Sequence, residues 1–99
     1  MKVEHMNHDK SGVFKLVDES SHKDVGEMSY LWENEDHMII EHTEIDPDYQ
    51  GKNLGLEMVT AAVDYARENE KKITPLCPFA NAVFKRHPEF ADVLQQNNH

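Results

Sequence analysis

The hydrophobic pattern of this chain changes its period once, at Asp46-Pro47-Asp48, and that change limits the folds open to the chain. Before this point, apolar and polar residues alternate at every second position, which is typical of half-buried strands. After it, from Leu56 to Ala66, apolar residues recur at every third or fourth position, which is the period of an amphipathic helix. The sequence therefore predicts a strand-rich first half and a helical second half.

The first half predicts an antiparallel meander. The alternating segments, which we expect to form its strands, are residues 3–6, 12–17, 25–33 and 37–45. Consecutive strands that are joined by short polar connections pair antiparallel. Within the third segment, Met28, Tyr30 and Trp32 share one face, and we expect that face to lie in the core.

The second half predicts one long helix, a short strand and two short helices. Lys71 and Lys72 place positive charge at the negative end of the long helix, where such charge is favourable. Residues 73–76 form the short strand, Pro78 fits the first position of the next helix, and Pro88 ends that helix. Because the long helix joins two strands, we predict a single α+β domain over residues 1–99, with a β-α-β crossover after the meander.

The chain is strongly acidic. Its 10 Lys and Arg residues stand against 19 Asp and Glu residues, which gives a formal net charge of −9. Binding to nucleic acid and to anionic membranes depends on basic patches, so this balance argues against both kinds of partner. The single cysteine, Cys77, suits a reducing compartment, and the first residues show no apolar signal segment. We therefore predict a cytoplasmic protein.

The segment that joins the last meander strand to the long helix holds the most informative residues. Gly51 and Gly55 stand where this helix is expected to begin. A helix N-terminus presents unpaired N–H groups and partial positive charge, and glycine lets a ligand approach the backbone closely. These features favour an anion site, to which Lys52 adds one charge. An ordinary strand-to-helix turn is the alternative.

The same segment nearly matches the calcium loop of an EF-hand. Asp46, Asp48, Gly51 and Glu57 fit that motif, whereas Gln50 departs from it. An EF-hand also needs a helix before its loop, and the alternation before this loop predicts a strand. The histidines are scattered along the chain, so the sequence predicts no metal site.

Residues 50–55, Gln-Gly-Lys-Asn-Leu-Gly, resemble the pyrophosphate loop of the GNAT superfamily of acyl-CoA N-acetyltransferases. That loop is written R/Q-x-x-G-x-G/A, and Asn53 stands where the superfamily usually has glycine. Asparagine tolerates a left-handed backbone better than most other residues. The segments 42–45, 75–79 and 87–90 are similar to a branch of very short, single-domain GNAT-like proteins.

This resemblance implies a reduced GNAT-like acyl-CoA N-acyltransferase fold with acetyl-CoA as cosubstrate. Acetyl-CoA would lie along splayed strands at Ile45, with its pyrophosphate on Gln50, Gly51, Lys52, Asn53, Leu54 and Gly55. Larger relatives carry additional N-terminal helices that shape the acceptor site. In this short chain we expect that site to be open or completed by a partner.

Cys77 is the first candidate catalytic residue. Pro78 at the first helical position would make Cys77 the N-cap, where free N–H groups and the helix dipole stabilise a thiolate. In the resembled branch, a cysteine in this P-x-C-P setting lies near the CoA thiol, which implies that Cys77 could accept the acetyl group. The alternative is a small, buried apolar side chain.

His42 is the second candidate catalytic residue. The alternation places His42 on the strand face of Met38 and Ile40, where an imidazole could remove the proton of an acceptor ammonium. A histidine held by a neighbouring hydrogen bond is the alternative, and Glu41 and Glu44 are further candidate bases.

Three functions stay open at the level of sequence. The resemblance favours an acetyl-CoA-dependent N-acetyltransferase whose acceptor is an unidentified primary amine, and the acidic surface would attract a cationic one. The second is a non-catalytic module that binds CoA or acyl-CoA. The third is an adaptor domain that binds no nucleotide.

Overall fold

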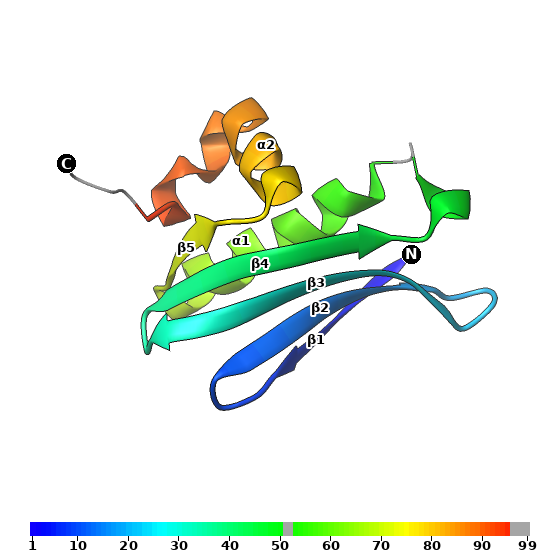
Figure 1. Ribbon diagram of the computed structural model, residues 1–99, viewed down its shortest axis with the longest axis horizontal. Coiled ribbons are helices and arrows are strands. Elements are labelled where there is room, and N and C mark those ends of the chain that lie inside the picture. The colour runs from blue at the N-terminus through cyan, green and yellow to red at the C-terminus, as the bar shows by residue number, and fades with distance from the viewer. Residues whose placement is uncertain (51–52, 96–99) are drawn as a thin grey trace.

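The computed structural model describes residues 1–50 and 53–95, which form a five-stranded sheet with helices on one side (Figure 1). The strands, in their order across the sheet, are β1 (Lys2–Asn7), β2 (Ser11–Asp18), β3 (Lys23–Asn34), β4 (His37–Ile45) and β5 (Lys72–Pro75). The first four pair antiparallel, and β5 pairs parallel to β4. The predicted meander and the β-α-β crossover are confirmed.

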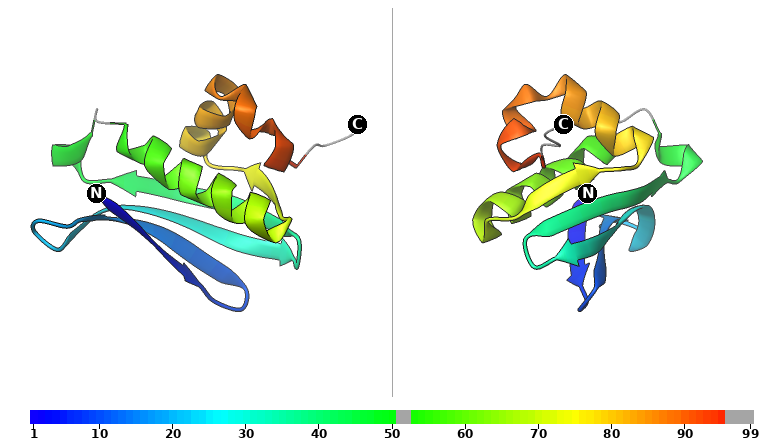
Figure 2. Two further views of the ribbon diagram at one scale, coloured as in Figure 1. Left: turned by 180° about the vertical axis from the view of Figure 1, so that it is seen from behind. Right: turned by 60° about the vertical axis from the view of Figure 1, so that its left-hand side comes forward.

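The long helix α1 (Leu54–Asn69) connects β4 to β5 and packs on one face of the sheet (Figure 2). A 3-10 turn, η1 (Pro47–Tyr49), precedes α1, whereas α2 (Pro78–Arg86) and the 3-10 helix η2 (Pro88–Val93) follow β5. α1 begins at Leu54, within the glycine-bearing segment where the helix start was expected. Leu54 and Gly55 are themselves buried, so the core extends to this end of the helix.

The core lies between α1 and the sheet. Met58, Val59, Ala62, Val63 and Ala66 of α1 pack against Phe14, Leu16, Met28, Tyr30, Met38 and Ile40. The predicted core positions Met28 and Tyr30 are confirmed as fully buried, and Trp32 packs against the core while partly exposed. Each fully buried Val, Leu, Ile, Phe or Met side chain contributes about 1.5–3 kcal/mol to folding.

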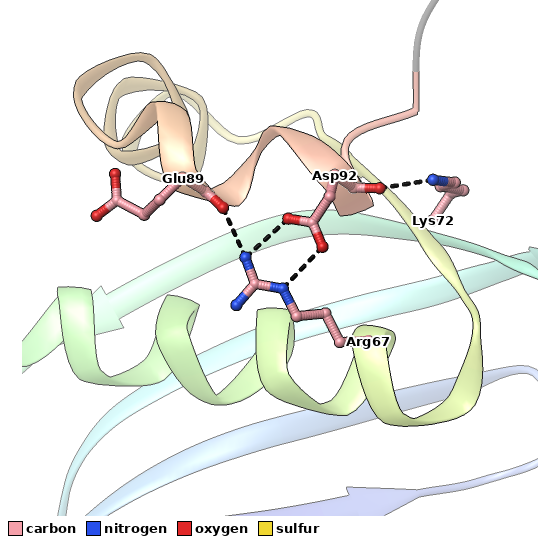
Figure 3. A network of polar contacts seen from close by, with 4 residues as sticks. All are labelled: Arg67, Lys72, Glu89 and Asp92. Carbon is pink, nitrogen blue, oxygen red and sulfur yellow. Dashed lines mark hydrogen bonds and ion pairs between the residues drawn. The ribbon is translucent and has the colours of Figure 1, made fainter.

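A network of polar contacts attaches η2 to the rest of the fold (Figure 3). Arg67 of α1 donates from Nε and Nη2 to the carboxylate of Asp92, at 2.8 and 2.7 Å, and from Nη2 to the Glu89 carbonyl oxygen at 2.6 Å. The Arg67 guanidinium lowers the pKa of the Asp92 carboxyl below its ordinary value. Lys72 Nζ adds a hydrogen bond to the Asp92 carbonyl oxygen at 2.6 Å. These contacts fix the segment that follows α2.

A β-bulge in β4 decides which side chains face the helices. Ser29 stands opposite His42, but the next residue of β3, Tyr30, stands opposite Ile40, so Glu41 is an extra residue in β4. One extra residue moves the side chains that follow it to the other face of the sheet. Ile40 is buried, whereas the His42 side chain is 65% exposed.

The prediction that His42 shares a face with Met38 and Ile40 is therefore wrong. After the bulge, Thr43 and Ile45 take the helix-facing positions: Thr43 stands opposite buried Met28, and Ile45 packs against the core.

No helix in the described ranges is long and apolar enough to cross a membrane. A cytoplasmic location stays a prediction.

Candidate functional site

β4 and β5 pair over only part of β4. The parallel pairing ends where Ile40 faces Pro75, and the N–H groups of Leu76 and Cys77 then both donate to the Ile40 carbonyl oxygen, at 3.0 and 3.1 Å. Beyond this point the chain leaves the sheet for α2 (Figure 1). Within the described part of the chain, residues 41–45 thus have no strand beside them on that edge. An extended ligand can pair with such an edge.

An open cavity of about 450 Å³ lies between this edge, the start of α1 and one face of α2. We call it the helix-side cavity. Residues from all three elements line it, including Thr43 and Ile45 of β4, Asn53 and Gly55 at the start of α1, and Phe79 and Arg86 of α2. No Asp or Glu of the described residues lines this cavity, although the chain has 19 of them. The described lining therefore contains the positive charge of Arg86 and no negative side chain, which favours an anionic ligand over a cationic one.

The predicted cosubstrate residues largely come together here. Ile45, Gln50, Asn53, Leu54 and Gly55 all line the helix-side cavity. The predictions for Gly51 and Lys52 lie outside the described residues. Gln50 Nε2 donates to the Ile45 carbonyl oxygen at 3.4 Å, which ties the start of the loop to the end of β4.

The start of α1 is suited to receive a ligand. Asn53, its N-cap, adopts the left-handed conformation (φ 58°, ψ 25°), which asparagine tolerates in place of the usual glycine. In the described part of this turn, the Asn53 side chain makes no capping hydrogen bond, so it leaves the first N–H groups of α1 uncovered. A Cβ atom on Gly55 would overlap the tip of the Phe79 ring, so any larger residue there would force this ring of α2 to move.

The start of α2 contrasts with that of α1 because a side chain caps it. Cys77 is the N-cap and Pro78 the first helical residue, as predicted, and Cys77 Sγ accepts a hydrogen bond from the Ala80 N–H at 3.4 Å. Cys77 Sγ also lies 3.2 Å from Thr43 Oγ1. Cys77 is only 5% exposed and is not among the lining residues of the cavity. Thr43 is therefore the contact between the thiol and the cavity.

A second hollow, of about 550 Å³, lies at the ends of β3 and β4 and shares Thr43, Ile45 and Gln50 with the helix-side cavity. Four carboxylates line it, those of Asp24, Glu27, Glu44 and Asp46. We call it the acidic hollow. No Lys or Arg of the described residues is part of its lining. The hollow is therefore suited to a cation.

Two of these four carboxylates have cationic partners at the rim of the acidic hollow. Asp46 Oδ1 accepts from the Asp48 N–H at 2.9 Å, and Asp46 Oδ2 lies 2.9 Å from Lys23 Nζ. The backbone hydrogen bond first, and Lys23 second, lower the pKa of the Asp46 carboxyl. Asp24 lies 3.5 Å from Lys15 Nζ. At neutral pH, Asp46 is thus a fixed negative charge of this rim.

The structure separates the two candidate catalytic residues. His42 Nε2 lies 2.9 Å from Glu44 Oε1, and Glu44 lines the acidic hollow while His42 does not. His42 is therefore one residue outside the acidic hollow, on the face that points away from α1. Cys77 is on the opposite, helix-facing side, next to Thr43.

Sequence reasoning did not assign several of the lining residues to the site, among them Thr43, Phe79 and Arg86. Thr43 links Cys77 to the cavity, but its orientation depends on the bulge, which no residue pattern announces. Phe79 and Arg86 line the cavity from α2. Both could have been found by asking which residues share the helical face of Val83, since they lie four residues before it and three after it.

The calcium alternative lacks its helix. β4 ends directly before Asp46, so the strand predicted before the loop is confirmed. An EF-hand requires a helix at that place. Among residues 1–50 and 53–95, no group of three or more His, Cys, Asp or Glu side chains could hold a metal ion.

Most of the sequence of this chain matches the sequence pattern of a known protein family. The sequence pattern of the family described as GCN5-related N-acetyl-transferase matches residues 13–93 of the 99-residue chain. The chain belongs to this family. No curated protein matches it by sequence.

Solved structures share its fold. A GCN5-like protein from Staphylococcus aureus has a TM-score of 0.71 and 25% identity, over 97% of this chain and 91% of that one. An aminoglycoside N-acetyltransferase in complex with CoA has a TM-score of 0.61 at 8% identity, over 99% and 97%. An aminoglycoside acetyltransferase from an uncultured soil metagenomic sample, in complex with sisomicin, has a TM-score of 0.59 at 16% identity, over 94% and 65%. The acyl-CoA N-acyltransferase fold expected for this chain is thereby confirmed.

Proposed function

We propose that this protein is an acetyl-CoA-dependent N-acetyltransferase that acts on a cationic primary amine. The observation that carries the proposal is that two hollows of opposite character meet at Thr43, Ile45 and Gln50. The helix-side cavity, which no described carboxylate lines, suits the anionic cosubstrate. The acidic hollow suits an ammonium group, since fields of this sign raise the local concentration of cations.

In this proposal, acetyl-CoA lies along the open edge of β4 at Ile45. Its pyrophosphate binds at the start of α1, where uncovered N–H groups and partial positive charge favour an anion. Gln50, Asn53, Leu54 and Gly55 line the cavity at that place. The acyl end then points toward Thr43, one of the three residues that both hollows share.

The reaction needs an amine that has lost its ammonium proton. We assign the removal of this proton to His42, which is held by Glu44 at the edge of the acidic hollow. The amine nitrogen then attacks the thioester carbonyl carbon, the C–S bond breaks, and the CoA sulfur leaves as a thiolate that takes up a proton. The new bond is an amide, and CoA is the second product.

Cys77 offers a two-step route for the same transfer. Its Sγ would form a bond to the acetyl carbon as the C–S bond of acetyl-CoA breaks, and its thiol proton would pass to the CoA sulfur. The amine would then attack the acetyl-cysteine and restore the thiol. The contact between Cys77 and Thr43 supports a position beside the thioester.

A CoA-binding module without turnover is the second candidate. Two observations favour it: Cys77 is almost entirely buried, and Asn53 replaces the usual loop glycine. This candidate shares the helix-side cavity with the first but needs no acceptor.

Two measurements test the proposal. CoA and acetyl-CoA should raise the melting temperature, and ligand at 100 times its dissociation constant should add about 2.7 kcal/mol to the free energy of unfolding. Release of CoA thiol from acetyl-CoA should accelerate with polycationic amines such as spermidine and an aminoglycoside, and less with a neutral hydroxylamine of similar size. Stabilisation without thiol release for any amine would support the binding module. No stabilisation by either ligand would contradict both candidates.

A further inference from the structure

We infer that Arg86 is a specificity residue for the cosubstrate, and that its guanidinium binds the 3′-phosphate of CoA. The protein would then distinguish CoA from 3′-dephospho-CoA. This inference rests on the proposed function, because it needs CoA in the helix-side cavity.

The position of Arg86 in α2 is the first argument. Phe79, Val83 and Arg86 are spaced four and three residues apart, which places them on one face of a helix, and all three line the helix-side cavity. At the Phe79 end, α2 touches Gly55 in the first turn of α1. Arg86 is seven residues further along α2, about 10 Å along its axis. The cavity therefore extends from the N–H groups of α1 to a guanidinium group.

The charge of Arg86 is the second argument, because nothing in the described structure neutralises it. Among the described residues, Arg86 has no ion-pair or hydrogen-bond partner for its guanidinium, and it is the single Lys or Arg in the lining of the cavity. The Arg67 guanidinium, in contrast, forms a bidentate ion pair with the Asp92 carboxylate (Figure 3). In a chain of net charge −9, an arginine that faces a cavity without carboxylates provides local attraction for an anion.

The chemistry of CoA is the third argument. Besides its pyrophosphate, CoA carries a phosphomonoester on the 3′ carbon of its ribose, and the sugar separates the two groups. The pyrophosphate suits the N–H groups at the start of α1. The phosphomonoester has a charge of roughly −1.5 to −2 at neutral pH, and the planar fork of an arginine fits its oxygens in pairs. Arg86 at the far side of the cavity is placed for this second group.

Neighbouring cations do not offer an equal alternative. His87 also lines the cavity, but its Nδ1 lies 3.2 Å from Glu89 Oε2 and its ring stacks on Phe90. Lys85 is exposed but is not part of the cavity lining. Lys85 is therefore a matched control: it is adjacent in sequence, has the same charge and belongs to the same helix.

The test measures the affinity of four proteins for CoA and for 3′-dephospho-CoA by titration calorimetry at low salt. The proteins are the unchanged chain, Arg86→Gln, Arg86→Lys and Lys85→Gln. Arg86→Gln should lower the affinity for CoA about 10- to 100-fold, as expected for a lost charge-assisted contact, and leave the affinity for 3′-dephospho-CoA within about twofold. Arg86→Lys should retain part of the preference, and Lys85→Gln should retain it in full.

Each other outcome overturns the inference in an identifiable way. Equal affinity of the unchanged chain for both ligands would show that the 3′-phosphate is not bound. An equal loss for both ligands in Arg86→Gln would place Arg86 at the pyrophosphate or in the packing of α2, which the melting temperature of the free variant separates. If the unchanged chain binds neither ligand, the proposed function itself fails.

Discussion

The helix-side cavity and the acidic hollow share the end of β4, yet one is lined by no described carboxylate and the other by four. One of these four carboxylates, that of Glu44, belongs to β4 itself, and its orientation follows from the bulge. After the bulge at Glu41, Thr43 and Ile45 contribute to both hollows, whereas Glu44 lines the acidic hollow alone. Because side chains alternate across a strand, one extra residue decides which of them faces the helices. Net composition therefore says little about the charge of a particular hollow.

The two hollows also differ in the kind of contact that stabilises their walls. Apolar packing and two helix starts build the helix-side cavity, with Phe79 against Gly55 and Cys77 against Thr43. Exposed polar contacts build the rim of the acidic hollow, chiefly between Lys23 and Asp46. Substitutions in the helix-side cavity should therefore have large effects on binding and activity. Substitutions in the acidic hollow should have smaller effects that depend on salt.

The largest effect is expected from Gly55→Val, which fills the helix-side cavity and leaves the acidic hollow intact. The new side chain would overlap the Phe79 ring, which lines the cavity, and force it to move. The CoA-dependent increase in melting temperature should disappear, and this increase should exceed about 10 °C in the unchanged chain, since 1 kcal/mol corresponds to about 4–8 °C for a domain of this size.

Two further variants control for the packing of α1. Thr60→Val places a valine in the same helix outside the helix-side cavity, by exchanging a hydroxyl for a methyl group, and should keep CoA binding. Combining Gly55→Val with Phe79→Ala removes the displaced ring and should restore part of the stabilisation. Unchanged CoA affinity in Gly55→Val would remove this turn from the site.

The next largest effect is expected at Cys77, the buried N-cap of α2, which contacts the cavity residue Thr43. If Cys77 accepts the acetyl group, Cys77→Ala should reduce acetyl transfer by more than tenfold, and Cys77→Ser should not restore it because a hydroxyl is a much weaker nucleophile. Mass spectrometry after mixing with acetyl-CoA should then find one acetyl group on Cys77.

Alkylation gives an independent measure of the same thiol. Saturating CoA should slow the reaction of Cys77 with iodoacetamide, because Cys77 would lie beside the bound thioester end. Alkylation that is insensitive to CoA, together with full activity of Cys77→Ala, would make Cys77 a packing residue. The amine would then attack the thioester directly.

The comparison also shows what the sequence could predict. The two periods of the hydrophobic pattern were enough for the meander, for α1 and for β5, since both periods follow from backbone geometry alone. The N-cap role of Cys77 followed from Pro78, and the left-handed Asn53 from its tolerance of positive φ. These features are local, so a short segment determines each of them.

Features that depend on distant contacts could not be predicted. The orientation of His42 was wrong because the bulge depends on how β4 pairs with β3, which a strand pattern does not contain. The contact of Phe79 with Gly55 joins residues that are more than twenty positions apart in the sequence, so no local pattern contains it. The acidic hollow combines carboxylates of β3 and β4 that are far apart in the sequence.

A moderate effect is expected from Glu27→Lys, which changes the acidic hollow and leaves the helix-side cavity intact. Among the described residues, Glu27 has no ion-pair partner, so a lysine there opposes a cationic acceptor without breaking an existing contact. kcat/KM for spermidine should fall about tenfold at low salt and less at high salt, with CoA affinity unchanged. Glu68→Lys on the exposed face of α1 has the same charge change and should leave kcat/KM within about twofold. Equal losses in both variants would indicate a general charge effect.

The smallest effect is expected from Asp46→Asn at the rim of the acidic hollow. The Asp48 N–H and Lys23 lower the pKa of the Asp46 carboxyl in the folded protein below the ordinary value of 3.8. The unfolded chain therefore binds the proton first as the pH falls, so the stabilisation by Asp46 is present above about pH 4 and is lost below it. Urea unfolding between pH 7 and pH 3 should show a steeper acid loss for the unchanged chain than for Asp46→Asn, with Lys23→Gln between them. Parallel pH profiles for the three proteins would mean that the contact between Lys23 and Asp46 contributes nothing to the free energy of unfolding.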